Sequence, residues 1–169
     1  MSSPTSISPD RLARLIGTAL LFIAAFAATV ATADERREKP ATIIFVCIHG
    51  SVKSQVAAAH FNQIAKERGL PFQAVSRGIA IDSSIPTTIR NGLALEGLAP
   101  SDDIPRGLTA EEANDANKVF AFDEVPTDRK GVANVIYWSD VPPATKDYNA
   151  ARDAIVRHLD DLMPSLTSK

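Results

Sequence analysis

The chain has 169 residues, of which 45% are apolar and 22% are charged, so it is long enough for one ordinary domain plus a short appendage. This composition is close to the globular average and excludes both a disordered protein and a polytopic membrane protein. The formal net charge of -2, with no run of Lys or Arg, argues against a nucleic-acid partner. A single cysteine excludes an intrachain disulfide and a multi-cysteine metal site, and we expect no cofactor and no metal ion.

The first 33 residues have the order of parts of a secretory signal peptide. Two arginines precede an uncharged stretch, 15–33, which ends in small residues before the charged sequence DERREK. We therefore expect cleavage after Ala33, a linker at 34–40, and a periplasmic or secreted domain at 41–169. The alternative is an uncleaved membrane anchor, because about 20 residues suffice to span a bilayer.

The first strand and helix are expected directly after this linker. From Ala41 to Ile48 the chain reads ATIIFVCI, a continuous apolar and β-branched run that is typical of a strand buried on both faces. A helix is expected from Ser51 to Arg68, because apolar residues recur there at helical spacing. Gly69 follows at the position of a C-terminal cap.

The middle of the chain continues the alternation of strands and helices. Residues 72–76 (FQAVS) predict a second strand, and a helix is expected from about Pro86 to about Gly97. The sequence T-x-x-E at 109–112 is a capping box that opens a short helix. Residues 118–122 (KVFAF) predict a third strand.

The last strand and helix give the clearest pattern. A fourth strand is expected to end at 135–138, and apolar residues from Tyr148 to Leu162 recur at steps of three and four along one face of a closing helix. Strands that alternate with helices predict right-handed crossovers. The expected fold class is therefore α/β, a three-layer sandwich with a central four-stranded parallel sheet and flanking helices.

The loop after the first strand is the expected site of chemistry, because ligands of open α/β sheets bind beyond the carboxyl ends of the strands. The only cysteine, Cys47, lies there at the start of the first helix, where unpaired N–H groups and the helix dipole favour a thiolate. Gly50 permits a close backbone approach, and Lys53 adds a full positive charge. The same loop is thus a candidate oxyanion-binding site.

In these residues the chain resembles the low-molecular-weight protein tyrosine phosphatase superfamily, and in particular its arsenate-reductase-like branch. The loop of that family reads C-x5-R-[ST], and its arsenate-reductase form, C-T-H-N-S-C-R-S-Q, is matched by CIHGSVKSQ at 47–55. Residues 76–78 (SRG) resemble the family's S-A-G. Residues 138–142 (WSDVP) resemble W-x-x-D-P, and Tyr148 with Arg152 and Asp153 resembles F-x-x-x-R-D.

The resemblance implies a phosphatase that hydrolyses phosphate monoesters of the phosphotyrosine type. Cys47 would attack phosphorus and form a cysteinyl-phosphate, Ser54 would donate a hydrogen bond to the thiolate, and Asp140 would protonate the leaving oxygen. The phosphate would be held by the loop residues Ile48, His49, Gly50, Ser51, Val52 and Lys53. The expected partners are a phosphorylated small molecule or a phosphoprotein, with inorganic phosphate or arsenate as a ligand.

Several departures from the family's pattern keep other functions open. Lys53 replaces the signature arginine, which grips two phosphate oxygens, so one alternative is a weak or inactive pseudophosphatase that only binds oxyanions. Arsenate reduction through an intramolecular disulfide needs further cysteines, which leaves a thiol redox role with an external partner as another alternative. Membrane contact is expected only if the leader is uncleaved.

The individual residues also have structural interpretations. Cys47 alone is typical of a small buried apolar residue, Asp140 of an ordinary loop or capping aspartate, and His49 of a structural residue. Arg77, which follows the second strand, is either solvated or reaches the loop in place of the missing guanidinium.

Overall fold

The computed structural model describes residues 39–167. The predicted signal peptide, most of the linker and the last two residues of the predicted domain lie outside the described residues. Within 39–167, no helix combines the length and the apolar character that crossing a bilayer would need.

The sheet has four parallel strands, as predicted, and their order is β2-β1-β3-β4. The strands are β1 (Ala41–Cys47), β2 (Phe72–Gly78), β3 (Lys118–Ala121) and β4 (Val135–Tyr137). β2 is two residues longer than its expected range of 72–76, because it pairs with β1 along the full length of both strands. This extension carries the chain up to Gly78 beside the loop that follows β1.

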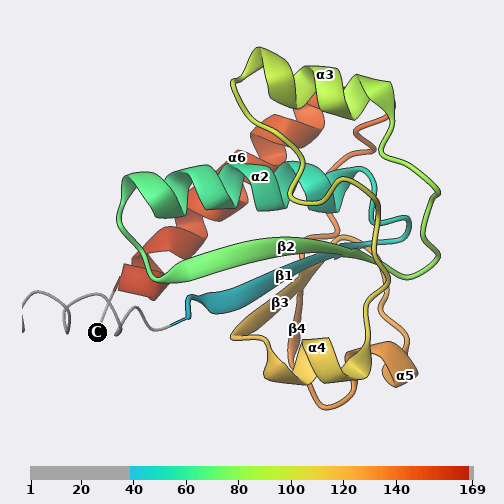
Figure 1. Ribbon diagram of the computed structural model, residues 1–169, viewed down its shortest axis with the longest axis vertical. Helices are drawn as coiled ribbons and strands as arrows, with labels where there is room; N and C mark the ends of the chain where they lie inside the picture. The colour runs from blue at the N-terminus through green and yellow to red at the C-terminus, as the bar shows by residue number, and fades with distance from the viewer. Residues whose placement is uncertain (1–38, 168–169) are drawn as a thin grey trace, which may run out of the picture. The chain divides into compact units, whose positions relative to one another are not determined.

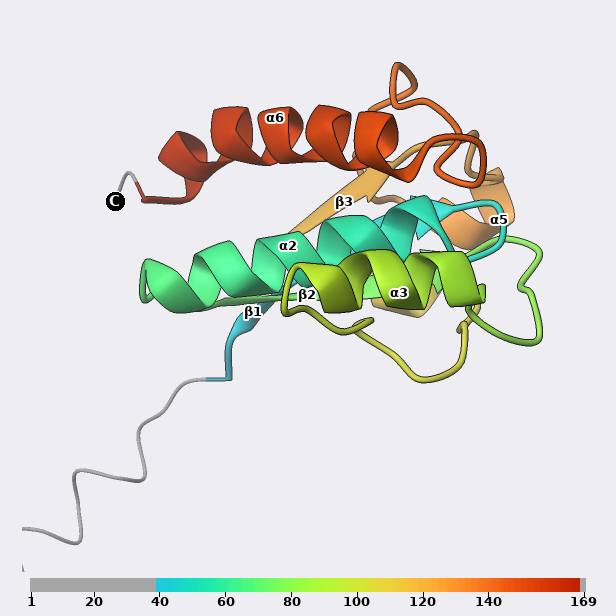
Figure 2. The same ribbon diagram turned by 90° about the horizontal axis from the view of Figure 1, so that it is seen from above.

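Helices cover both faces of the sheet and complete the three-layer sandwich (Figure 1). One face carries α2 (Lys53–Glu67), α3 (Thr87–Leu95) and α6 (Tyr148–Thr167), and the other carries α4 (Ala110–Asp115) and α5 (Thr127–Lys130). Figure 2 shows α2 and α6 side by side, both beginning at the same end of the sheet. Both helices therefore direct their N-terminal ends toward the carboxyl edge of the strands.

The alternation of side chains along β1 builds the two apolar layers. Ile43, Phe45 and Cys47 belong to the cluster shared with α2, α3 and α6, whereas Ile44 and Val46 belong to the cluster on the α4 side. Successive side chains of a strand point to opposite faces, so a strand buried on both sides has to be apolar throughout. This confirms the interpretation of the run ATIIFVCI.

The ends of the predicted helices follow the local signals in the sequence, and one short helix was not predicted. Gly69 has φ = +62° after α2, and the hydroxyl of Thr109 accepts a hydrogen bond from the N–H of Glu112 at 3.1 Å as the N-cap of α4. The carboxylate of Glu112 is bound mainly to Arg77, and a backbone hydrogen bond from Thr109, as in a capping box, also helps to lower the pKa of Glu112. The helix α5 was not expected, since a single four-residue turn carries no periodic pattern.

Candidate active site

The loop from Cys47 to Lys53 joins the carboxyl end of β1 to the start of α2. Its backbone is tied to the segment after β2: the carbonyl of Ile48 accepts hydrogen bonds from Ile79 and Ala80, each at 2.8 Å. The carbonyl of His49 accepts one from Asp82 at 3.2 Å. The loop therefore lies where a ligand of a parallel α/β sheet is expected.

Two glycines bring the loop and the end of β2 into direct backbone contact. Gly50 has φ = +66°, a left-handed conformation that favours glycine, and a Cβ atom on it would lie 2.9 Å from the nitrogen of Gly78. A Cβ atom on Gly78 would in turn lie 2.7 Å from the nitrogen of Gly50. Neither position can carry a side chain without moving the backbone of the loop.

The sulfur of Cys47 is at the end of a buried chain of hydrogen bonds. It lies 3.0 Å from the hydroxyl of Ser54, and the hydroxyl of Ser76 donates to Ser54 at 2.8 Å. The single hydrogen of Ser76 has a second acceptor, the carbonyl of Gly50 at 3.1 Å. When Ser76 donates to Ser54, the Ser54 hydroxyl is free to donate its own proton to the sulfur. The contact between the Ser54 hydroxyl and the sulfur is the one that the family resemblance implies for Ser54.

Gln55 holds the turn of the loop from inside the fold. Its amide nitrogen donates to the carbonyl of Gly50 at 3.1 Å, and its amide oxygen accepts from the N–H and the hydroxyl of Ser101 at 3.0 and 3.1 Å. The side chain has no solvent exposure. These hydrogen bonds fix the orientation of the Gln55 amide, which holds the carbonyl of Gly50 toward the interior of the fold.

The N–H groups of the loop remain available to a ligand. The residue before α2, Val52, makes no side-chain cap, and among the described residues no hydrogen bond has an N–H of residues 49–53 as its donor. Unpaired amides at a helix N-terminus bind anions, because they add local N–H donors to the positive end of the helix dipole. The expected oxyanion cradle is therefore compatible with the observed backbone.

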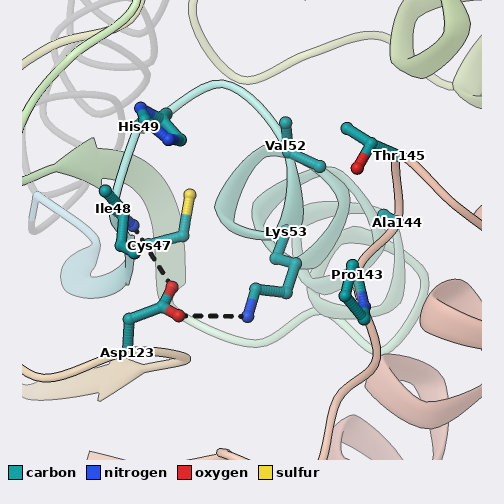
Figure 3. Close-up of a pocket in the computed structure, with 9 residues that line it drawn as sticks. All are labelled: Cys47, Ile48, His49, Val52, Lys53, Asp123, Pro143, Ala144 and Thr145. Atoms are coloured by element: carbon teal, nitrogen blue, oxygen red, sulfur yellow. Dashed lines mark hydrogen bonds and ion pairs between the residues drawn. The ribbon is translucent and has the colours of Figure 1, made fainter.

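A small pocket of about 210 Å³ opens over this loop (Figure 3). It is lined by Cys47, Ile48, His49, Val52, Lys53, Asp123, Pro143, Ala144 and Thr145. Of the predicted phosphate-binding residues, Gly50 and Ser51 are buried and do not line it, and the Ser51 hydroxyl donates to Asp82 at 2.5 Å. The imidazole of His49 is half exposed and lies 3.1 Å from the carbonyl of Ala80.

Asp123 is the charged lining residue that sequence reasoning missed, and the uncharged lining residues 143–145 were not predicted either. One carboxylate oxygen accepts from the N–H of Ile48 at 3.2 Å, and the other lies 3.5 Å from the ammonium of Lys53 (Figure 3). The Lys53 nitrogen also lies 5.4 Å from the centre of the Phe122 ring. The signal for Asp123 was its position directly after the third strand, at the same carboxyl edge as Cys47.

Asp140, the predicted acid, is not brought into the pocket. Its carboxylate is exposed and lies 2.8 and 3.0 Å from Nε2 of His158, and this hydrogen bond lowers the pKa of Asp140 below its ordinary value. The His158 ring stacks on Trp138 at 4.7 Å between ring centres. On this side the pocket wall consists of residues 143–145 instead.

Arg77 adopts neither of the two expected positions. It is 7% exposed and lies on the opposite face of β2 from Ser76, where its guanidinium donates to Glu112 at 2.7 to 3.0 Å. This hydrogen bond lowers the pKa of Glu112. Asp102 lies 3.7 Å from the same guanidinium, so Arg77 cannot replace the missing loop arginine.

Comparisons with known proteins identify the family and the fold of the chain. The family described as "Low molecular weight phosphotyrosine protein phosphatase" matches residues 42–132. The fold is similar to a structure of the YwlE arginine phosphatase in a cysteine-to-serine mutant whose active-site serine is phosphorylated, at 21% identity and a TM-score of 0.67, covering 76% of this chain and 97% of that one. No curated protein sequence matches the chain.

Two further solved structures represent both branches of the expected family. The low molecular weight protein tyrosine phosphatase from T. tengcongensis is 20% identical, with a TM-score of 0.66 over 75% of this chain and 99% of that one. The arsenate reductase from Archaeoglobus fulgidus is 25% identical, with a TM-score of 0.55 over 75% of this chain and 99% of that one.

Proposed function

Because this chain belongs to the low molecular weight phosphotyrosine protein phosphatase family, a family of cysteine-dependent phosphatases, we propose that it hydrolyses phosphate monoesters through Cys47. The observation that carries this proposal is the combination of a sulfur 3.0 Å from the Ser54 hydroxyl with a loop of unpaired N–H groups beside it. A nucleophile and an oxyanion cradle are the two parts that phosphoryl transfer needs most.

In the proposed reaction the Cys47 thiolate attacks phosphorus in line, and the bond from phosphorus to the leaving oxygen breaks. A cysteinyl-phosphate forms, and water then attacks it to release inorganic phosphate and restore the thiolate. The amides of residues 49–53 would hold the equatorial oxygens, and the hydrogen bond from Ser54 would stabilise the sulfur as it leaves. Lys53 would add a single compact charge where an arginine would grip two oxygens.

The leaving oxygen needs a proton, and the sequence-based proposal assigns this step to Asp140. In the described conformation that carboxylate is bound to His158, so the segment between β4 and α6 has to move before Asp140 can act. We therefore expect turnover to depend strongly on the leaving group. Aryl phosphates, whose phenolate leaves without help, should react faster than alkyl phosphates.

A second candidate is an oxyanion-binding protein with little or no turnover. The observations that favour it are the position of Asp140 outside the pocket and the ion pair that holds Lys53 on Asp123. A third candidate, a thiol redox protein, would pair Cys47 with an external thiol. It is supported by the arsenate reductase among the similar structures and by the presence of one cysteine in the sequence.

One experiment separates the three candidates. The purified chain and its Cys47→Ser variant are assayed with p-nitrophenyl phosphate from pH 5 to 7, and the binding of phosphate and arsenate is measured in parallel. A phosphatase shows turnover that the variant lacks. An oxyanion-binding protein binds the anions without turnover. A redox protein exchanges with an added small disulfide such as oxidised glutathione, in which the Cys47 thiolate forms the mixed disulfide and one small thiol is released.

We also propose that the chain is exported, on the basis of its sequence alone. The leader-like segment at 1–33 supports cleavage after Ala33 and a periplasmic or secreted phosphatase acting on a phosphorylated small molecule or a phosphoprotein. Mass spectrometry of the protein from the exported fraction should find an N-terminus at Asp34. A chain that retains Met1 and sediments with membranes would instead support the uncleaved anchor.

A further inference from the structure

The pocket over Cys47 contains one side-chain cation and one side-chain carboxylate, and the two are paired. The Lys53 ammonium lies 3.5 Å from Asp123, whose other oxygen accepts from the N–H of Ile48 at 3.2 Å. Their side chains are 15% and 27% exposed, so both retain contact with the pocket while being largely desolvated. Among the nine lining residues, all of them described, Asp123 is the only carboxylate.

This pairing offsets the charge that an anion would meet in the loop. Lys53 contributes one positive charge, whereas Asp123 and the Cys47 thiolate of the proposed reaction each contribute a negative one, so the attraction left for a ligand comes mainly from the backbone amides. The repulsion from Asp123 is proportional to the charge of the ligand, so a dianion experiences twice the repulsion of a monoanion at the same position. Of the other wall residues, Cys47, His49 and Thr145 carry polar groups, and Ile48, Val52, Pro143 and Ala144 are apolar.

We propose that Asp123 is a specificity-determining residue that biases the loop toward singly charged tetrahedral oxyanions over doubly charged ones. This proposal rests on the oxyanion-binding function proposed above and adds a charge class to it. The preferred form of a phosphate ester would be the monoprotonated one, which carries a single negative charge.

The alternative role of Asp123 is purely positional, and it predicts an effect of opposite sign. If the carboxylate serves to orient the Ile48 N–H and the Lys53 ammonium toward the ligand, its removal weakens the binding of every anion. If it serves to exclude charge, its removal strengthens binding, and more for dianions. Asp123→Asn separates the two roles, because the amide keeps an oxygen that can accept from Ile48 but carries no charge.

The experiment uses two anions of fixed charge, so that ligand protonation does not enter. Sulfate is a dianion and methanesulfonate a monoanion at neutral pH, and both present tetrahedrally arranged oxygens. Their affinities are measured at constant ionic strength as protection of Cys47 from iodoacetamide, with the full chain and its Asp123→Asn variant. The matched control is Asp161→Asn, which removes the same charge from an exposed position near the far end of α6.

The proposal predicts that Asp123→Asn tightens sulfate binding about tenfold and methanesulfonate binding about threefold, because the Coulomb energy scales with ligand charge. Asp161→Asn should change either affinity by less than about twofold, because the helical rise of about 1.5 Å per residue places it about 20 Å along α6 from Tyr148, beyond a screening length of about 8 Å. Weaker binding of both anions in Asp123→Asn would establish the positional role and overturn the proposal. Equal strengthening, or no change, would overturn it as well.

The outcome also distinguishes this proposal from the proposed function. If the parent chain binds an anion and Asp123→Asn does not shift the preference, the charge selection is wrong and the oxyanion-binding function stands. If neither chain binds either anion, both proposals are wrong. Should Asp123→Asn fail to give the circular dichroism spectrum of the parent, Asp123→Ser repeats the test, because its hydroxyl is also a neutral acceptor.

Discussion

Replacing Gly78 by alanine tests whether the loop needs its close approach to β2. The added Cβ atom would lie 2.7 Å from the nitrogen of Gly50 and 2.8 Å from the carbonyl carbon of His49. The first distance is about 0.7 Å shorter than the 3.4 Å at which ordinary contact begins, and both neighbours are backbone atoms. The loop therefore has to shift by roughly that amount, which displaces its N–H groups from the positions that a phosphate would occupy.

We expect Gly78→Ala to lower turnover of p-nitrophenyl phosphate by about 100-fold, because a displacement near 1 Å costs about that factor in a preorganised site. Phosphate affinity should fall in parallel, and the free energy of unfolding should decrease by about 1 to 3 kcal/mol from the overpacking. The matched control is Gly107→Ala. Gly107 forms an isolated bridge with Gly78, but a Cβ atom on it would approach no closer than 4.0 Å to Arg129.

Steady-state kinetics measures the turnover of the two variants, phosphate titration their phosphate affinity, and thermal denaturation their stability. The reasoning is refuted if Gly78→Ala keeps its turnover and its phosphate affinity within about twofold of the parent. It is also refuted if Gly107→Ala loses activity to the same extent, because the effect would then be a general loss of stability.

Three further substitutions test other parts of the site. Ser54→Ala removes the hydroxyl 3.0 Å from the Cys47 sulfur and should lower turnover about 10- to 100-fold with little change in KM, as steady-state kinetics would show. Lys53→Arg should raise turnover of p-nitrophenyl phosphate about tenfold or more, because a guanidinium binds two oxygens; an unchanged rate would argue that residue 53 does not face the anion. Glu112→Gln should lower the free energy of unfolding by about 1 to 2 kcal/mol at pH 7, since it weakens the partner of the buried Arg77 guanidinium while solvent screens the half-exposed carboxylate. The pKa of Glu112 is lowered in the folded state, so its contribution is present above the unfolded pKa and is lost as the pH falls through the folded one. The difference in Tm between the parent and Glu112→Gln should therefore shrink on acidification from pH 6 to 3, and a constant difference would contradict the assignment.

The sheet and the loop were predictable because their signals are local. A strand buried on both faces has to be apolar throughout, which β1 shows in its sequence, and the N–H of Glu112 meets Thr109 within one helical turn. The contact between Cys47 and Ser54 spans seven positions of strand, turn and helix, so the motif alone indicated it. Arg77 was also predictable in principle, because strand alternation directs it away from the face that Ser76 occupies.

The remaining parts of the site depend on contacts that are distant in the sequence. Asp123 meets Ile48 and Lys53 across 75 and 70 positions, and no motif in the sequence joins them. The orientation of Asp140 is set by His158, which lies 18 positions away on α6. The imidazole ring of His158 in turn stacks on Trp138. Such pairings follow from how the layers pack, which the pattern of apolar residues does not specify.

The reactivity of Cys47 toward iodoacetate tests the account most directly, because this reagent is itself an anion that the loop would attract. At pH 6 the folded chain should be carboxymethylated at Cys47, with one carboxymethyl group per chain by mass spectrometry and a rate well above that of the unfolded chain. Inorganic phosphate should slow this reaction in a saturable manner. A Cys47 that reacts only after unfolding, or whose reaction is indifferent to phosphate, would contradict the existence of an anion site around the sulfur.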